Sequence, residues 1–250
     1  MLIFLNCLKG FAQSTDRYKM CPEGEDSCGP QQYDSERVMI IGQSLQQGPF
    51  SFILHQEIKR GGTNYSTGSF ISPDMLITAH HNVFQPGFIR KLSFCNKSID
   101  AEHWVTFKRK EVEIFTFSSA HAPTDIAIIK FKNPAKIAEL YRGHFNVGSF
   151  EETGDSAVFH LTGFPCDRPD TLVEKSATTP RIRLHENQTL IGYQMYTCTG
   201  DSGAPLWYSH ENSPTIVGIH HGGCEGNFST DWNCSAQITS NVVAWIDRLR

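Results

Sequence analysis

Short apolar runs alternate with turn residues along most of this chain, from Val38 onward. Most of the runs are flanked by Gly, Pro, Asn or Asp, which favour turns and end strands. Many short strands separated by turns are typical of an all-β barrel architecture, and we predict an all-β fold. The clearest runs are 49–54, 69–71, 75–79, 126–131, 157–161, 206–207, 216–219 and 236–238.

The two ends of the chain have different patterns. Residues 1–13 contain a short apolar stretch and are predicted to be a signal peptide. Residues 14–37 are polar and turn-rich and are expected to be a pro-segment or linker, with Cys21 and Cys28 placed for a local bridge. At the other end, apolar residues fall on one helical face, so we expect a helix at about 240–249 that Ser240 can cap.

Composition narrows the class of protein. With 250 residues, of which 39% are hydrophobic, the chain can bury one large core or two smaller ones. A net charge of −4 disfavours nucleic acid as a partner. No apolar stretch approaches the roughly 18 residues of a membrane span, so no membrane insertion is expected. Eight cysteines and Asn-X-Ser/Thr sequons favour a secreted glycoprotein; the sequons begin at Asn64, Asn96, Asn187, Asn227 and Asn233.

The most informative motif lies at 196–206, where a serine stands between two glycines. Gly200 and Gly203 allow a tight turn that exposes the hydroxyl of Ser202. The same turn can aim the backbone N–H groups of Gly200 and Ser202 at one point, which is the geometry of an oxyanion hole. Ser202 is therefore a candidate nucleophile, provided that a base and an orienting carboxylate occur elsewhere.

Both partners occur upstream of the serine. The apolar segment 76–79 runs into His80 and His81, and Asp125 precedes another apolar strand. We predict that His81 is the general base, because this segment resembles the one around the catalytic histidine of chymotrypsin-like serine proteases; His80 is the alternative. Asp125 would orient the imidazole, and the order His, Asp, Ser is the chymotrypsin-like one.

On these residues, the chain resembles secreted serine proteases of the chymotrypsin fold, and most of all the V8-like glutamyl endopeptidases. The segment 161–169 (LTGFPCDRP) adds a match outside the catalytic motifs. The resemblance implies two six-stranded antiparallel β-barrels and a C-terminal helix within 38–250, the second barrel starting at about 146. It also implies a serine endopeptidase acting on proteins or peptides, without a cofactor, and we expect a monomer.

The resemblance further implies a specificity pocket. V8-like enzymes use a threonine five positions before the serine and a histidine in a Gly-Ile-His-x-Gly-Gly segment to bind an acidic side chain. In this chain the implied pocket residues are Thr197, Thr199, His220, Gly222 and Gly223. They predict cleavage after Glu, or Asp. Trypsin-like cleavage is disfavoured, because the place of its pocket acid is taken by Tyr196.

Three further expectations concern cysteines, maturation and metal. The trypsin-like pattern implies a Cys198–Cys224 disulfide, with the pairing of the remaining cysteines left open. Asp201 matches the acid that pairs with a new amino terminus, which Val38 would supply if the chain is cleaved after Arg37. No metal is expected, because the histidine pairs lack Cys-x-x-Cys or His-x-x-x-His spacing.

Two other functions remain open from the sequence. The chain could be a catalytically silent homologue that serves as a binding module, although such homologues usually lose a triad residue and this chain keeps all three. It could also be an active protease with aromatic or broad specificity, in which His220 is only structural.

Overall fold

The computed structural model describes thirteen stretches of the chain, and all structural statements below refer to them: 37–39, 51–58, 62–83, 89–95, 104–118, 123–153, 157–165, 173–178, 182–184, 189–195, 197–211, 213–224 and 232–250. The predicted signal peptide and the Cys21–Cys28 segment lie outside the described residues.

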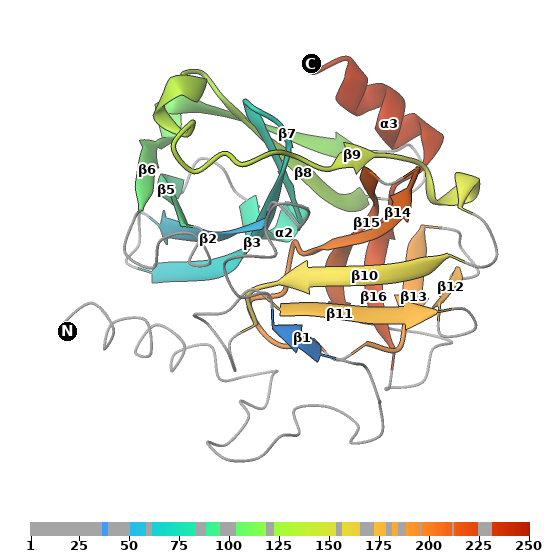
Figure 1. The fold of residues 1–250 in the computed structure, drawn as a ribbon. Coiled ribbons are helices and arrows are strands. Elements are labelled where there is room, and N and C mark those ends of the chain that lie inside the picture. Colours follow the sequence, from blue (N-terminus) through green and yellow to red (C-terminus); the bar gives the residue numbers. More distant parts are fainter. Residues whose placement is uncertain are drawn as a thin grey trace, which may run out of the picture.

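Two packed sheets form the molecule (Figure 1). The first, seven-stranded over the described residues, has the order β6-β5-β2-β3-β4-β8-β7, and all its pairs are antiparallel. Its strands are β2 (Ser51–Ile58), β3 (Gly62–Ser72), β4 (Met75–Thr78), β5 (Ile89–Cys95), β6 (Val105–Lys108), β7 (Val112–Ser118) and β8 (Pro123–Phe131).

The second sheet has nine strands among the described residues, in the order β1-β11-β10-β14-β15-β16-β13-β12. The ninth strand, β9, pairs in parallel with β15, while the other pairs are antiparallel. The strands are β1 (Arg37–Met39), β9 (Asn146–Val147), β10 (Val158–Gly163), β11 (Val173–Thr178), β12 (Ile182–Leu184), β13 (Leu190–Tyr193), β14 (Pro205–His210), β15 (Ser213–Gly223) and β16 (Asn233–Gln237).

The predicted fold class is confirmed: the described chain is mostly β-strand, in two sheets, with a helix at its C-terminal end. The sheets contain seven and nine described strands where the resemblance implied six each. Short strands account for the difference: β6, β1 and β12 lie at sheet ends, and β9 adds a two-residue pairing to β15.

The central strands of the first sheet are buried on both faces, which explains their uninterrupted apolar sequences. In β4, Leu76 lies in the core of the first sheet, whereas Met75 and Ile77 lie in a core shared with the second sheet. In β8, Ile129 and Ile128 divide between the same two cores. Because successive residues of a strand point to opposite faces, one strand can serve both cores. The shared core therefore fixes β4 and β8 against β14–β16.

The C-terminal helix α3 (Ser240–Asp247) packs on this shared core through Val242 and Ile246. Its N-cap is Thr239, whose Oγ1 accepts a hydrogen bond from the Val242 N–H at 3.5 Å, rather than the predicted Ser240. None of the described helices is long and apolar enough to cross a membrane. The other helical turns are α2 (His80–Val83), η3 (Arg109–Glu111), η4 (Pro134–Lys136) and η5 (Phe150–Glu152).

Candidate active site

The register between β4 and β8 brings the predicted base to the predicted carboxylate. Thr78, the last residue of β4, pairs with Ala127 of β8. The chain continues from Thr78 into α2, which carries His81, while Asp125 precedes Ala127 on the neighbouring strand. The His81 N–H donates to Asp125 Oδ1 at 2.7 Å, and His81 Nδ1 lies 2.6 Å from Asp125 Oδ2. Two hydrogen bonds thus fix both the backbone and the ring of His81 relative to Asp125.

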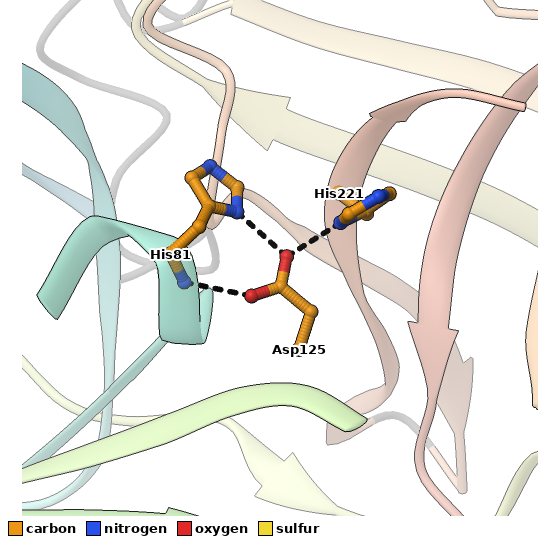
Figure 2. Close-up of side chains that lie close together, drawn as sticks. All are labelled: His81, Asp125 and His221. Atoms are coloured by element: carbon orange, nitrogen blue, oxygen red, sulfur yellow. Dashed lines mark hydrogen bonds and ion pairs between the residues drawn. The ribbon is translucent and has the colours of Figure 1, made fainter. Parts of the chain in front are cut away.

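A second histidine contacts the same carboxylate. His221, on β15 of the other sheet, places its Nδ1 at 2.6 Å from Asp125 Oδ2, the oxygen that His81 Nδ1 also contacts (Figure 2). The two rings lie edge to face, with their centroids 5.8 Å apart. An ionised carboxylate only accepts hydrogen bonds, so both imidazoles carry a proton on Nδ1 in this arrangement.

The charge of Asp125 is stabilised by these contacts. Partial burial raises the pKa of the carboxyl, but hydrogen bonds from His221 and His81, together with the positive charge that His81 can carry, lower it by more. The net effect holds the pKa of Asp125 well below its ordinary value. Asp125 is therefore a carboxylate at neutral pH and can stabilise a positive charge on a neighbouring imidazole.

The backbone around Ser202 forms the tight turn that Gly200 and Gly203 predicted. Gly200 has φ 99° and Gly203 has φ 86°, both in the region that glycine adopts without strain. A Cβ on Gly203 would lie 2.2 Å from the backbone oxygen of Thr67, so the first sheet approaches the turn at this point too closely for any side chain. The turn therefore depends on glycine for conformation and for space.

Two residues, one on β3 and one on α2, hold this turn in place. The Thr67 N–H donates to Ser202 O at 2.8 Å, and Thr67 Oγ1 donates to Gly200 O at 2.8 Å. Asn82, next to His81 on α2, donates from Nδ2 to Ser202 O at 3.1 Å. The Asn82 bond connects the backbone of the predicted nucleophile to α2, which carries the predicted base.

The predicted nucleophile and the predicted base, Ser202 and His81, are not joined by a direct hydrogen bond between their side chains in the described residues. Within the described parts of the chain, the structure joins Ser202 to His81 only through the Asn82 amide and the backbone, and no hydrogen bond connects Ser202 Oγ to His81. The structure thus brings the His81–Asp125 pair into contact and positions the serine turn beside it.

His220, the predicted pocket histidine, is almost completely buried, with 3% of its surface exposed. Its Nδ1 lies 2.5 Å from Tyr193 Oη on β13, and Ser235 Oγ on β16 donates to the same Tyr193 oxygen at 3.3 Å. Burial strongly raises the pKa of Tyr193, so the phenol keeps its proton. A neutral Tyr193 can therefore donate to His220 Nδ1.

The other predicted pocket residues lie in two segments, one before Gly200 and one at the end of β15. Thr197 is half-buried and Thr199 is exposed in the segment before Gly200; within the described chain, no hydrogen bond joins either hydroxyl to His220. A Cβ added to Gly222 or Gly223 on β15 would meet no atom within 4 Å, so both glycines border open space. Tyr196, which occupies the place of the trypsin pocket acid, lies outside the described residues.

The predicted Cys198–Cys224 disulfide is wrong. Cys224 is bonded to Cys234 of β16, with the Cα atoms 5.1 Å apart. The register explains this choice, because Gly222 pairs with Cys234 across β15 and β16 and brings the end of β15 next to it. The serine turn is held to β15 by backbone bonds instead: Gly203 N–H to His220 O at 2.9 Å and His220 N–H to Ala204 O at 2.8 Å.

Asp201 is fully buried, and its Oδ2 accepts a hydrogen bond from the Cys198 N–H at 3.0 Å. Val38 belongs to β1, where it pairs with Glu174 of β11. Cleavage after Arg37 and an ion pair between the new amino terminus and Asp201 stay predictions.

Sequence reasoning missed four residues that build the site. Thr67 and Asn82 anchor the serine turn, Tyr193 contacts the predicted pocket histidine, and His221 contacts Asp125. Of these four residues, only His221 has a sequence signal, as half of a histidine pair, although that pair lacks metal-ligand spacing.

Two packed antiparallel sheets, a histidine–aspartate pair at their junction and an adjacent Gly-Asp-Ser-Gly turn define a serine endopeptidase of the chymotrypsin fold. Residues 39–246 match the Trypsin family, and the chain belongs to that family.

Solved structures agree with this fold. A Glu endopeptidase in complex with MPD is 20% identical, with a TM-score of 0.63 over 86% of this chain and 97% of that one. A thermostable serine protease, AL20, from an extremophilic microorganism is 12% identical, with a TM-score of 0.59 over 80% of this chain and 95% of that one. No curated protein matches the chain.

Proposed function

We propose that this serine endopeptidase uses Ser202 as nucleophile, His81 as general base and Asp125 as the orienting carboxylate, and that it cleaves after Glu or Asp. The observation that carries the triad assignment is the double hydrogen bond between His81 and Asp125, next to the anchored Ser202 turn. The observation that supports cleavage after acidic residues is the burial of His220 on β15, next to His221.

In the proposed reaction, His81 Nε2 takes the proton of Ser202 Oγ as that oxygen attacks the carbonyl carbon of the substrate. The N–H groups of Gly200 and Ser202 stabilise the oxyanion. When the C–N bond breaks, the imidazolium returns its proton to the leaving amine. A water molecule then repeats these steps on the acyl-enzyme, with His81 again as base, and releases the acid.

Asp125 contributes through the tautomer and the charge of His81. A hydrogen bond from His81 Nδ1–H to Asp125 leaves Nε2 as the acceptor, which is the form a base requires. The low pKa of Asp125 supports this role, because the carboxylate stays ionised while His81 becomes positive. Of the two candidate bases, it is His81 whose ring nitrogen Nδ1 lies 2.6 Å from Asp125 Oδ2.

For specificity, we infer that His220 recognises the substrate carboxylate as a neutral donor. Ser235 donates to Tyr193, and Tyr193 O–H donates to His220 Nδ1, so the imidazole proton lies on Nε2 and can be donated to the substrate. Burial increases the strength of such a bond to an anion. Thr197, Thr199, Gly222 and Gly223 would complete the pocket. The fold of a protein described as a Glu endopeptidase also supports acidic specificity.

The proposal includes a secreted monomer that matures by cleavage after Arg37. The Cys224–Cys234 disulfide supports an oxidising compartment. The amino-terminal sequence of the active form, read from protein purified from the culture medium, tests this part: a start far from Val38 would exclude the proposed cleavage.

The activity is tested by labelling with a fluorophosphonate and by hydrolysis of peptides that differ only in Glu, Asp or Phe before the scissile bond. We expect wild type, but not Ser202→Ala, to be labelled. His220→Leu should lower the Glu-to-Phe ratio of kcat/KM by roughly two to four orders of magnitude, the scale of an unpaired buried charge. An unlabelled wild type would indicate a silent homologue, and an unchanged ratio would make His220 structural.

A further inference from the structure

The two histidine pairs of the sequence each contribute one member to a single cluster. His81 Nδ1, Asp125 Oδ2 and His221 Nδ1 all lie within 4.8 Å of one another. They come from α2, β8 and β15, so both sheets take part (Figure 2). Spacing within a single segment therefore cannot reveal this cluster, because its three residues come together only in the folded protein.

The cluster can be reached from solvent. The side chains of His81 and His221 are 41% and 46% exposed, and that of Asp125 is 15% exposed. An ion can therefore approach the three donor atoms without unfolding of either sheet, and the exposed rings can adjust to it.

The donor set has a definite chemical preference. Two imidazole nitrogens and one carboxylate oxygen suit Zn²⁺, which accepts three protein ligands and a water. Other late first-row divalent ions that favour imidazole share this preference, whereas Mg²⁺ and Ca²⁺ favour sites built only from oxygen.

We propose that His81, Asp125 and His221 form an inhibitory site for Zn²⁺ or a similar divalent transition metal, which reversibly switches the protease off. The present Nδ1–Oδ2 separations of 2.6 Å are hydrogen-bond distances. Ligand atoms about 2.0–2.1 Å from a tetrahedral Zn²⁺ lie roughly 3.3 Å apart. Each Nδ1–Oδ2 separation therefore has to increase by roughly 0.7 Å for the hydrogen bond to be exchanged for a metal bond.

The inhibition follows from the proton on His81, and this step rests on the proposed role of His81 as base. A metal bound at Nδ1 uses the lone pair of that atom, so the ring proton moves from Nδ1 to Nε2. No proton needs to be lost, because the imidazole only changes its tautomer. The Nε2 atom then carries hydrogen and cannot accept the proton of Ser202. The metal also occupies Asp125, which no longer orients the imidazole.

His221 distinguishes this site from nonspecific binding to histidines. It supplies the third ligand, whereas His80, adjacent to His81 in sequence, does not belong to the cluster. His221→Gln keeps an N–H that can donate toward Asp125 but removes the imidazole ligand. His80→Ala is the matched control for a lost surface histidine.

Metal binding itself is measured first, on Ser202→Ala protein, so that the result does not depend on catalysis. Calorimetric titration with ZnCl₂ should give one site per chain. Adding His221→Gln should raise Kd at least about tenfold, because the loss of a ligand costs no less than the loss of a group that only orients a ligand. Adding His80→Ala should leave Kd unchanged. The absence of binding, or equal Kd values with and without His221, would overturn the proposal. Equal melting temperatures would establish that the variants are folded.

Activity is measured second, on the enzyme with Ser202 intact, each variant relative to its own metal-free rate. The Zn²⁺ concentration that half-inhibits the wild type and His80→Ala should equal the Kd from calorimetry. Activity should recover on addition of EDTA, and Ca²⁺ should not inhibit. Binding without inhibition would overturn the switch. A wild type without activity or fluorophosphonate labelling would instead contradict the proposed function, while the calorimetry would still decide whether the metal site exists.

Discussion

Thr67→Val tests how the first sheet positions the serine turn. Thr67 is fully buried, and its hydroxyl donates to Gly200 O at 2.8 Å and accepts from the Phe164 N–H at 3.2 Å. Valine has nearly the same shape but no hydroxyl. The substitution therefore leaves a buried acceptor and a buried donor without their partner, while the Thr67 N–H can still bond to Ser202 O.

The magnitude follows from these two groups. Each buried polar group left unsatisfied costs about 1–3 kcal/mol, so we expect a loss of about 2–4 kcal/mol in the free energy of unfolding after some relaxation. The Gly200 peptide also loses the bond that fixes its orientation, and its N–H is a proposed oxyanion donor. Removal of such a donor lowers kcat about 100-fold or more, so a loosened one should lower kcat about 10- to 100-fold.

The assay combines urea unfolding with steady-state kinetics, and Thr67→Ser is the matched control. Serine keeps the hydroxyl and removes a methyl group, so it should cost about 1 kcal/mol of stability and leave kcat close to wild type. A Thr67→Val protein with an unfolding free energy within about 0.5 kcal/mol of wild type, or with unchanged kcat, would refute the proposed anchoring.

Three further predictions concern the serine turn, the pocket and the disulfide. Gly203→Ala should abolish activity and lower the melting temperature, because its Cβ would lie 2.2 Å from a backbone oxygen; normal kinetics would contradict that geometry. Tyr193→Phe removes the donor to His220 Nδ1, so the Glu-to-Phe ratio of kcat/KM should fall about tenfold or more; an unchanged ratio would exclude control of the imidazole by Tyr193. Cys234→Ser should lower stability by about 2–4 kcal/mol, and mass spectrometry of the oxidised protein should show a Cys224–Cys234 peptide in the wild type.

Much of this protein can be read from local sequence. Gly200 and Gly203 predicted a tight turn around Ser202, and in the structure both have a positive φ, which few other residues adopt. The apolar runs at β4 and β8 predicted strands, and His81 and Asp125, which lie beside them, were paired through the His, Asp, Ser order of chymotrypsin-like proteases. The register of β4 with β8 then brings the two residues together. These predictions concern single segments or a recognised order of segments.

The tertiary structure decided which side chains meet. His220 and His221 are neighbours on β15 at a bulge, where the register with β16 shifts between His220 and Gly222, so regular strand alternation does not by itself fix where the two rings point. The sequence does not state that one face meets Tyr193 and the other meets Asp125. Those contacts depend on the register of β15 with β16 and on the packing of two sheets, as does the Cys224–Cys234 bond. A shift of one residue would exchange the two faces, so contacts between distant segments are fixed only when the whole core is packed.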